Sequence, residues 1–262
     1  MNTWVLLYHA IDSQETPFSG SRADTSVVVD ANAFARQLAR IGKLSKKVVS
    51  LDAALANPDS DIEQVVITFD DGHSSNWFWA LPLLRQFGAT ATFYVISGKI
   101  NVDRDYLTED QIRELHKSGM TIGSHTVTHR FLPTLSETEI RRELTESKDR
   151  LEQILGIGVD HLALPGGHFD RRTFTIARAC GYKSLATCEI GVLGRDLDPM
   201  RIPRLEIRRG MSETDFELVF TNSTMRKMRM IEGGKACLRK VFGLSNYSRL
   251  RTLAHRMIDL SR

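Results

Sequence analysis

The chain has 262 residues, of which 42% are hydrophobic and 26% are charged, with 18 Gly and 7 Pro. This balance excludes a collagen-like chain, a small disulfide scaffold and a wholly disordered chain. A chain of this length can bury its own core, and it matches the roughly 250 residues of a typical single α/β barrel.

The formal net charge of +3 is unevenly distributed along the chain. Residues 222–262 contain ten Lys and Arg residues but two acidic residues, so this segment carries +8 and residues 1–221 carry −5. We therefore expect a mildly acidic body over 1–221 and a basic extension over 222–262. The extension has few aromatic residues to stack on bases, so we expect no nucleic-acid partner. The sequence says nothing of the oligomeric state.

The start of the chain lacks the features of a signal peptide. The first basic residue is Arg22, and the only early apolar run is Trp4 to Leu7. No apolar run approaches the roughly 18 residues of a membrane-spanning helix. The three cysteines contain no C-x-x-C pair, which argues against a disulfide framework and a cysteine zinc site. If the native chain begins at Met1, we expect a cytoplasmic location.

Short apolar runs, several of them rich in Val and Ile, alternate with helical patterns over the body of the chain. This alternation predicts a parallel sheet, either open or closed into a barrel. In a barrel, the loops at the carboxyl ends of the strands build the active site. Strands are predicted at 3–8, 47–51, 64–69, 91–96, 120–124, 161–164, 183–187 and 202–207.

Two capping boxes mark the starts of predicted helices. Thr108 with Gln111 begins one helix, and Ser136 with Glu139 begins a second helix that ends at Gly156.

Residues 249–260 predict a further helix with one apolar face and a basic remainder. We favour a helix that packs on the body and leaves its basic side in solvent. The alternative is a helix that lies on an anionic membrane surface.

Three motifs each follow a predicted strand. In the first, strand 64–69 runs into Asp70, Asp71 and a glycine. Adjacent carboxylates raise one another's pKa unless a cation lies between them, so a metal or an arginine is expected nearby. The alternative is an ordinary polar Asp-Gly turn.

The second motif contains His125 and His129, four residues apart and just after strand 120–124. Two histidines at this spacing can reach one metal, and together with a carboxylate they suit zinc and neighbouring divalent metals. The alternative for either histidine alone is a structural role.

The third motif is a turn, Leu164-Pro165-Gly166-Gly167-His168, after strand 161–164. Its backbone N–H groups are not covered by side chains, so they can face a developing oxyanion. The alternative is a simple tight turn.

Together the three motifs resemble those of the polysaccharide deacetylase family, the carbohydrate esterases of family 4 with the NodB homology domain. The runs Thr-Phe-Asp-Asp-Gly and His-Thr-x-x-His stand in the family's order, and residues 91–95 resemble the strand between them. The resemblance covers about 3–210 and leaves out the extension. It implies a distorted parallel (β/α) barrel of about seven strands and metal-dependent removal of N-acetyl groups, usually from N-acetylglucosamine units.

By position, the resemblance implies that Asp70 is the catalytic base and that the backbone of Gly166 helps to bind the oxyanion. It implies a bound divalent metal, for which Zn²⁺ is our first expectation and Co²⁺, Ni²⁺, Mn²⁺ or Fe²⁺ are alternatives. The implied metal ligands are Asp71, His125 and His129, and the implied substrate-binding residues are Pro165, Gly167 and His168.

The chain departs from the family pattern at one arginine. Family members often have an arginine two residues before the proline of the third motif, where it pairs with the base. Here that position is Ala163, and we expect Arg204 to supply the charge from another strand.

A second departure concerns the general acid. The late Leu-x-His motif, whose histidine is the acid, is missing, and the only later histidine, His255, lies in a helical pattern. Leu7-Tyr8-His9 closes the first predicted strand instead and resembles the start of exopolysaccharide N-deacetylases with a permuted strand order. We therefore predict His9 as the acid, with His73 and His168 as alternatives and a structural role for His9 also open.

Two other functions remain open at this stage. The chain could be a deformylase or deacetylase of a lipid-linked amino sugar at the inner membrane face, with peripheral membrane contact through the basic extension. It could also be a non-catalytic sugar-binding module, which the missing arginine at Ala163 would suit.

Overall fold

The computed structural model describes residues 2–13, 25–58, 60–194 and 198–242. The contacts divide the chain into two compact units, 1–219 and 220–262. The described part of the second unit contains the helix α8 (Asn222–Phe242). The helix predicted at 249–260 and His255 lie outside the described residues. None of the helices in the described ranges is long and apolar enough to span a membrane.

The first unit is built on parallel strands in the order β10-β1-β5-β6-β7-β8-β9. A parallel bridge between Ala186 of β9 and Ile202, just before β10, joins the two ends of this order. The sheet therefore curls into a distorted barrel of seven strands, as the resemblance predicted. The seven strands are β1 (Thr3–Tyr8), β5 (Gln64–Phe69), β6 (Thr92–Val95), β7 (Thr121–Ser124), β8 (His161–Ala163), β9 (Ser184–Ala186) and β10 (Leu205–Glu206).

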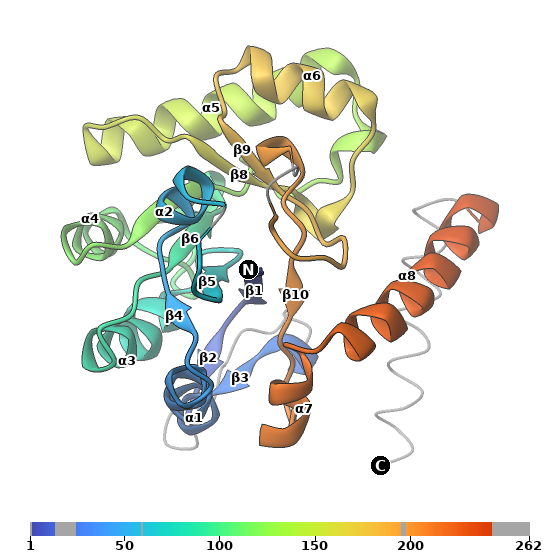
Figure 1. Ribbon diagram of the computed structural model, residues 1–262. Coiled ribbons are helices and arrows are strands. Elements are labelled where there is room, and N and C mark those ends of the chain that lie inside the picture. The colour runs from blue at the N-terminus through green and yellow to red at the C-terminus, as the bar shows by residue number, and fades with distance from the viewer. Residues whose placement is uncertain (1, 14–24, 59, 195–197, 243–262) are drawn as a thin grey trace. The chain divides into compact units, whose positions relative to one another are not determined.

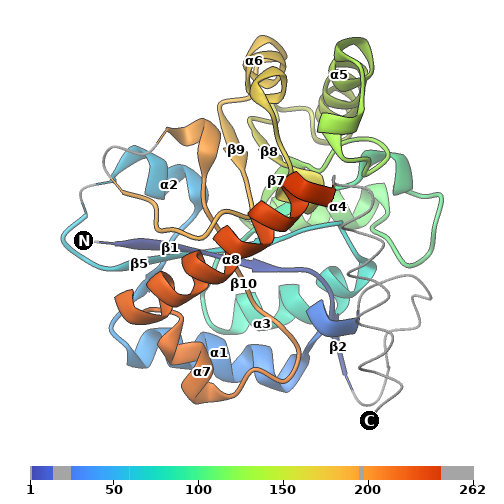
Figure 2. The same cartoon turned by 90° about the vertical axis from the view of Figure 1, so that its right-hand side faces the viewer.

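Helices of the first unit lie around the outside of these strands (Figures 1 and 2). All but α7, which follows β10, lie in the connections between parallel strands, as in other α/β barrels. The helices are α1 (Ala31–Lys43), α2 (Leu51–Ala56), α3 (Leu81–Gln86), α4 (Glu109–Lys117), α5 (Glu137–Leu155), α6 (Arg171–Ala179) and α7 (Glu213–Leu218). Shorter helical turns cover Thr25–Val27, Asn76–Ala80, Ser97–Lys99, Leu132–Thr134, Pro165–Gly167 and Pro199–Arg201.

The first strand lies beside the strand that carries the acidic motif. All six residues of β1 and of β5 are buried, as expected for parallel strands covered on both faces. Their register pairs Tyr8 with Phe69, and the Asp70 N–H donates to the Tyr8 carbonyl at 2.9 Å. His9 and Asp70 therefore follow the paired ends of adjacent strands and lie at the same end of the barrel, although they are far apart in sequence.

The structure corrects three details of the predicted elements. Residues 47–51 are not one strand, because β4 (Lys47–Val48) is followed by Ser50, which caps α2. Residues 202–207 contain a bridge and the short β10 rather than a continuous strand. A small parallel pair of β2 (Ile11–Asp12) and β3 (Val29–Asp30) was not predicted.

Both predicted capping boxes are confirmed. Thr108 and Gln111 exchange side-chain and backbone hydrogen bonds at the start of α4, and Ser136 and Glu139 do so at the start of α5. Gly156 ends α5 in the left-handed conformation, with φ of 71°. Each of these helices therefore begins where its own sequence satisfies the free N–H groups.

A glycine in β7 allows close packing in the barrel. A Cβ at Gly123 would lie 2.5 Å from the Tyr94 ring and 3.0 Å from the His161 carbonyl. Gly123→Ala should therefore lower the free energy of unfolding by about 1–3 kcal/mol, measured by urea denaturation. Gly42→Ala in α1 is the control, because a Cβ there meets nothing within 4 Å. It should raise stability by up to about 1 kcal/mol, and equal losses in both variants would contradict this packing argument.

Candidate active site

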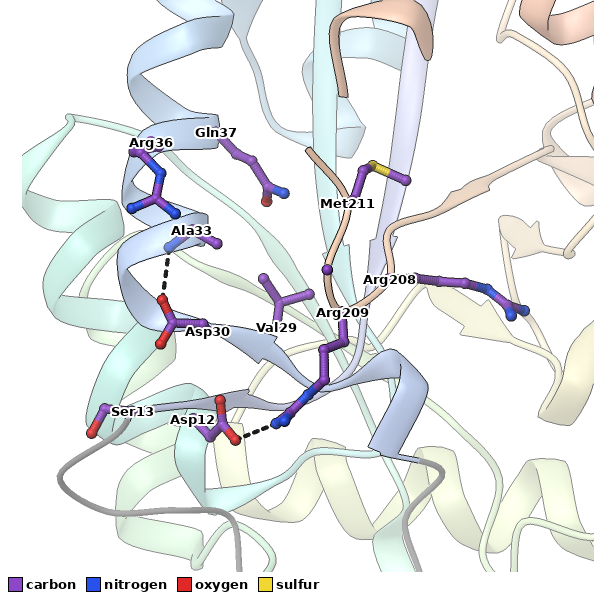
Figure 3. A pocket seen from close by; sticks show the side chains of 11 residues that line it. Asp12, Ser13, Val29, Asp30, Ala33, Arg36, Gln37, Arg208, Arg209 and Met211 are labelled. Atoms are coloured by element: carbon purple, nitrogen blue, oxygen red, sulfur yellow. Dashed lines mark hydrogen bonds and ion pairs between the residues drawn. The ribbon is translucent and has the colours of Figure 1, made fainter. Parts of the chain in front are cut away.

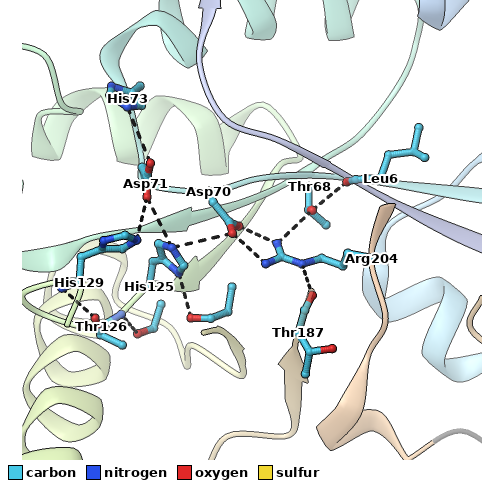
Figure 4. A network of polar contacts seen from close by, with 12 residues as sticks. Leu6, Thr68, Asp70, Asp71, His73, His125, Thr126, His129, Thr187 and Arg204 are labelled. Carbon is cyan, nitrogen blue, oxygen red and sulfur yellow. Dashed lines mark hydrogen bonds and ion pairs between the residues drawn. The ribbon is translucent and has the colours of Figure 1, made fainter. Parts of the chain in front are cut away.

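Polar side chains follow two strands at one end of the barrel (Figure 4). Asp70 and Asp71 come directly after β5, and His125 comes directly after β7. His129 lies four residues further along the same loop. Because β5, β6 and β7 are parallel neighbours, their carboxyl ends meet at one edge, and the two motifs converge there.

Asp71, His125 and His129 form a compact cluster. Each offers one ligand atom, and these atoms lie within 4.8 Å of one another. Asp71 Oδ1 lies 3.5 Å from His125 Nε2 and 3.3 Å from His129 Nε2. His129 is the most exposed of the three, with 39% of its side chain accessible, so the cluster opens towards solvent on its side.

The cluster fits a divalent metal by three observations. Tetrahedral ligands bound at 2.0–2.1 Å lie roughly 3.3–3.4 Å apart, close to the separations found here. Asp71 Oδ1 is buried without a hydrogen-bond partner, as a metal ligand would be. His125 Nδ1 contacts the Ala163 carbonyl at 2.9 Å, which fixes the ring and turns Nε2 towards the cluster.

Burial keeps His125 in the form that binds metals. Removal from water lowers the pKa of His125 to about 4, and this effect outweighs the nearby carboxylates. The imidazole is therefore neutral at pH 7, and its free nitrogen can act as a ligand.

The backbone is strained around the cluster. Asp71, Thr126 and His129 have positive φ angles of 72°, 66° and 61°, which are uncommon for residues other than glycine. Such conformations cost free energy and persist only where the surrounding structure imposes them. They gather here at the residues that present the ligand atoms.

Asp70 is held by an arginine from the segment just before β10, which is two strands away from β5 in the sheet. Arg204 Nη1 donates to Asp70 Oδ1 at 2.6 Å, and Nη2 donates to Oδ2 at 2.8 Å. Arg204 Nε donates to the Thr187 carbonyl at 2.9 Å, and the whole side chain is buried. The structure therefore puts Arg204 against Asp70, where the sequence predicted a charge to replace the one missing at Ala163.

This pairing determines the charge of Asp70. Burial alone would raise its pKa, but the Arg204 guanidinium, with His125 nearby, outweighs burial and lowers the pKa of Asp70 to about 2. Asp70 is therefore ionised at any physiological pH. Its Oδ2 lies 3.8 Å from His125 Nε2, so the carboxylate borders the cluster without belonging to it.

Comparison with known proteins agrees with this geometry. Residues 57–185, which include both the acidic and the histidine motifs, match the family described as polysaccharide deacetylase. Over this segment, which is just under half of the chain, the protein is similar to the polysaccharide deacetylase family. Among curated relatives, the Bacillus subtilis protein named "Putative polysaccharide deacetylase YxkH" is 32% identical over 58% of this chain and 54% of its own length.

A second curated relative is the peptidoglycan-N-acetylglucosamine deacetylase of Bacillus cereus. It is 29% identical over 46% of this chain and 54% of its own length. The chain thus matches about half the length of each of these two relatives.

A similar solved structure covers more of the barrel. The Streptococcus pyogenes deacetylase PplD, determined in complex with acetate, superposes with a TM-score of 0.75 and 27% identity. The match covers 84% of this chain and 99% of that chain.

His9 lies close to the acidic motif. Its side chain is half-buried, and its Nδ1 is buried without a hydrogen-bond partner. Burial raises the pKa of Asp71, but electrostatic interaction with the surrounding histidines, His9 first, outweighs burial and lowers that pKa. The register of β1 against β5 explains why a residue from the start of the chain reaches this place. Its role as the acid stays a prediction.

Neighbouring side chains lie close to the two glycines in the turn of the third motif. Gly166 is exposed, with φ of 61°, and a Cβ there would lie 2.9 Å from Phe131 Cε1 and 3.0 Å from His168 Cδ2. A Cβ at Gly167 would collide with Cys188. Both positions therefore require glycine, and the rings of Phe131 and His168 flank the backbone of Gly166. The oxyanion role of Gly166 and the substrate contacts of Pro165, Gly167 and His168 stay predictions.

Two further groups support the site. The Ala163 carbonyl orients His125, and a backbone group leaves no trace in the sequence. His73, an alternative acid, is buried with its ring stacked on Tyr106 at 4.8 Å and its Nε2 3.9 Å from Asp71 Oδ2. Burial lowers the pKa of His73. These contacts suit a residue that supports Asp71 better than one that reaches a substrate.

A pocket of about 450 Å³ lies away from the cluster, beside α1 and the segment after β10 (Figure 3). Arg209 pairs there with Asp12, and Asp30 caps the start of α1. Arg209 and Asp12 satisfy each other, Asp30 accepts the Ala33 N–H, and none of the lining residues belongs to the metal cluster. The family chemistry therefore points to the cluster rather than to this pocket.

The Arg204 pairing predicts a large stability effect. In metal-free protein, Arg204→Met should lower the free energy of unfolding at pH 7 by about 3–5 kcal/mol, because it leaves a buried carboxylate unpaired. Arg201→Met is the matched control, since Arg201 pairs with Glu189 at an exposed surface. It should cost less than about 1 kcal/mol. Urea unfolding measures both, and a similar small loss in each would contradict the buried pairing.

The same pair predicts a pH dependence. The folded pKa of Asp70, about 2, lies below the usual value of about 4, so its stabilisation is present at neutral pH and is lost as the pH falls from about 4 to 2. In Arg204→Met, burial raises this pKa instead, and protonation relieves the penalty. The stability difference between the two proteins should narrow as the pH falls from 7 to 4. A constant difference would argue against it.

The cluster predicts loss of metal in one variant. His125→Ala should bind divalent metal at least tenfold more weakly than the wild type, because it removes one of three ligands. His116→Ala, a histidine of α4 outside the cluster, should bind as the wild type does. Metal content after dialysis and calorimetric titration with Zn²⁺ measure both. Equal affinity in His125→Ala would show that the ligand assignment is wrong.

Proposed function

We propose that the chain is a metal-dependent hydrolase that removes the N-acetyl group from an N-acetylated amino sugar. The substrate would be an N-acetylglucosamine-type unit of a polysaccharide, an oligosaccharide or a glycolipid precursor. The observation that carries this proposal is the meeting of Asp70 with Asp71, His125 and His129 at the ends of β5 and β7. The printed names of the relatives, one a peptidoglycan-N-acetylglucosamine deacetylase and one a deacetylase solved with acetate, support it.

Asp71, His125 and His129 would hold the metal. Two imidazoles and one carboxylate suit Zn²⁺, and Co²⁺, Ni²⁺, Mn²⁺ or Fe²⁺ also accept these donors. When bound, the metal would polarise the amide carbonyl and make water a nucleophile near neutral pH. Three protein ligands leave room for substrate, which favours a catalytic over a purely structural metal.

Asp70 would act as the general base. It is ionised, it borders the cluster and it does not belong to the ligand set, so its carboxylate can accept the proton of the attacking water. Arg204 would keep both carboxylate oxygens oriented through its two hydrogen bonds. Positioning of the base before substrate arrives removes an entropic cost from the reaction.

Gly166 and His9 would complete the reaction. The exposed backbone of Gly166 would donate its N–H to the oxyanion that forms when water adds to the carbonyl. His9 would donate a proton to the departing nitrogen as the C–N bond breaks. The products would be acetate and a free amino sugar, and water would supply the atoms that balance the reaction. Pro165, Gly167 and His168 would line the same side of the substrate.

The alternatives differ in substrate or in turnover. A lipid-linked amino sugar would use the same residues, and the basic segment beginning at 222 is the feature that suits an anionic surface. A sugar-binding module would keep the cluster without turnover. The ionised base paired with Arg204 argues against it, because a binding module has no use for a buried carboxylate held in this way. Peripheral membrane contact and a cytoplasmic location stay predictions of the sequence.

The decisive experiment measures acetate and formate released by Zn²⁺-loaded protein. The panel would contain N-acetylglucosamine oligomers, a nucleotide-linked N-acetyl sugar and a lipid-linked amino sugar. Acetate would support the deacetylase proposal, and the responding member would identify the substrate class. Formate from the lipid-linked sugar would favour the deformylase. Tight sugar binding without release of either acid would favour the binding module.

Asp70→Asn should separate catalysis from metal binding. The rate of acetate release should fall by roughly 10²–10⁴-fold, because the amide cannot accept the proton. Bound metal should remain at the wild-type level, since Asp70 lies outside the ligand set. Asp160→Asn, which breaks the exposed pair with Lys183, is the control and should keep full activity. Full activity in Asp70→Asn would refute its role as the base.

A further inference from the structure

Helix α5 buries a carboxylate on the face that it packs against the barrel. That face includes the apolar residues Ile140, Leu144 and Leu151, but it also includes Glu143, which is only 3% exposed. Removing a carboxylate from water costs several kcal/mol unless hydrogen bonds replace the lost hydration. A leucine at this position would be buried without this desolvation cost, so the Glu143 carboxylate requires hydrogen bonds that replace its hydration.

The Glu143 carboxylate accepts three hydrogen bonds from one short loop. Oε2 accepts the N–H groups of Val127 and Thr128, both at 2.9 Å, and Oε1 accepts the Thr128 hydroxyl. These three donors lie between the ligands His125 and His129 in the sequence. The carboxylate is therefore bonded to the segment that connects the two histidines, and it does not touch the ligand atoms.

The opposite side of the same loop is also held. The Ser97 N–H donates to the Thr126 carbonyl at 3.0 Å, and the Gly98 N–H donates to the Val127 carbonyl at 3.1 Å. A Cβ at Gly98 would lie 2.5 Å from the Val127 carbonyl oxygen, so this approach requires glycine. The loop is thus fixed between the backbone after β6, which binds its carbonyl groups, and Glu143, which binds its N–H groups.

The loop needs such support because of its conformation. Thr126 and His129 both have positive φ angles, at the two ends of the segment that Glu143 holds. A strained loop relaxes unless its surroundings select the strained form. Without an acceptor for the N–H groups of Val127 and Thr128, the two histidines would lose their fixed separation.

We propose that Glu143 is a positioning residue that holds His125 and His129 in the geometry for binding one divalent metal. The proposal rests on the proposed metal site and deepens it, because it places part of the metal affinity in a helix that supplies no ligand. Groups that orient metal ligands typically change metal affinity by 10–100-fold when they are removed. Glu143 would do so by preorganising the loop.

The test is Zn²⁺ affinity, measured by competition with a chelator, together with the visible spectrum of Co²⁺-loaded protein. Glu143→Ala should bind Zn²⁺ 10–100-fold more weakly and should show a changed Co²⁺ spectrum. Glu143→Gln should restore most of the affinity, because its amide oxygen can accept the two N–H groups and its NH₂ can donate to the Thr128 hydroxyl. Leu151→Ala, in the same buried face of α5, is the control for lost stability.

Leu151→Ala should lower the melting temperature of the metal-free protein while leaving Zn²⁺ affinity as in the wild type. The proposal is overturned if Glu143→Ala binds Zn²⁺ as tightly as the wild type, or if Leu151→Ala loses as much affinity. If Glu143→Ala does not fold, Thr128→Val removes one of the three hydrogen bonds at smaller cost. Wild-type affinity in Thr128→Val would then overturn the proposal.

Zn²⁺ binding and acid release are measured separately, so a failure of the Glu143 proposal can be distinguished from a failure of the proposed function. Wild-type protein that binds Zn²⁺ but releases no acid would contradict the substrate assignment and leave the comparison of Glu143 variants valid. Wild-type protein that binds no divalent metal would overturn both.

Discussion

The closure of the parallel sheet by its first strand is the constraint on which the candidate site depends. β1 lies between β5 and β10, so the barrel is completed by segments from both ends of the first unit. The pairing of β1 with β5 puts His9 beside the acidic motif, and the addition of β10 to the other side of β1 brings Arg204 to Asp70. In an open sheet in chain order, Arg204 would lie at the opposite edge from β1 and could not reach Asp70. The chemistry proposed for the site therefore follows from topology as much as from the motifs themselves.

The site also shows how a barrel can hold several charged groups in its interior. Asp70 is buried with Arg204, and the free-energy cost of each charge is offset by the other and by hydrogen bonds. The ligand cluster lies further out, where His129 reaches solvent. A buried, fixed ion pair therefore lies beside a more accessible cluster, an arrangement that suits the proposed function, in which the base stays fixed while the cluster admits the substrate.

Much of this arrangement could be predicted from the sequence, because local patterns report local structure. The strands at 3–8 and 64–69 have the predicted limits, and both capping boxes begin their helices. The segment 47–51 was misjudged because Ser50 acts as a helix cap, which an apolar run conceals. Glu143 was missed altogether. An acid on a helix normally indicates a solvent-exposed face, and only the folded loop shows that it is buried.

The insertion of β1 between β5 and β10 also sets an order of events during synthesis. Leu6 pairs with Leu205, so β1 is made first but cannot be paired on that side until nearly all of the first unit has been made. Until then the growing sheet has open edges at β1 and β9, which are templates for aggregation. Contacts between such distant segments also slow folding. Arg204 directly precedes Leu205, so its guanidinium is also made at this late stage. The segment 204–206 therefore supplies both the strand that covers the open edge of β1 and the positive charge that pairs with Asp70.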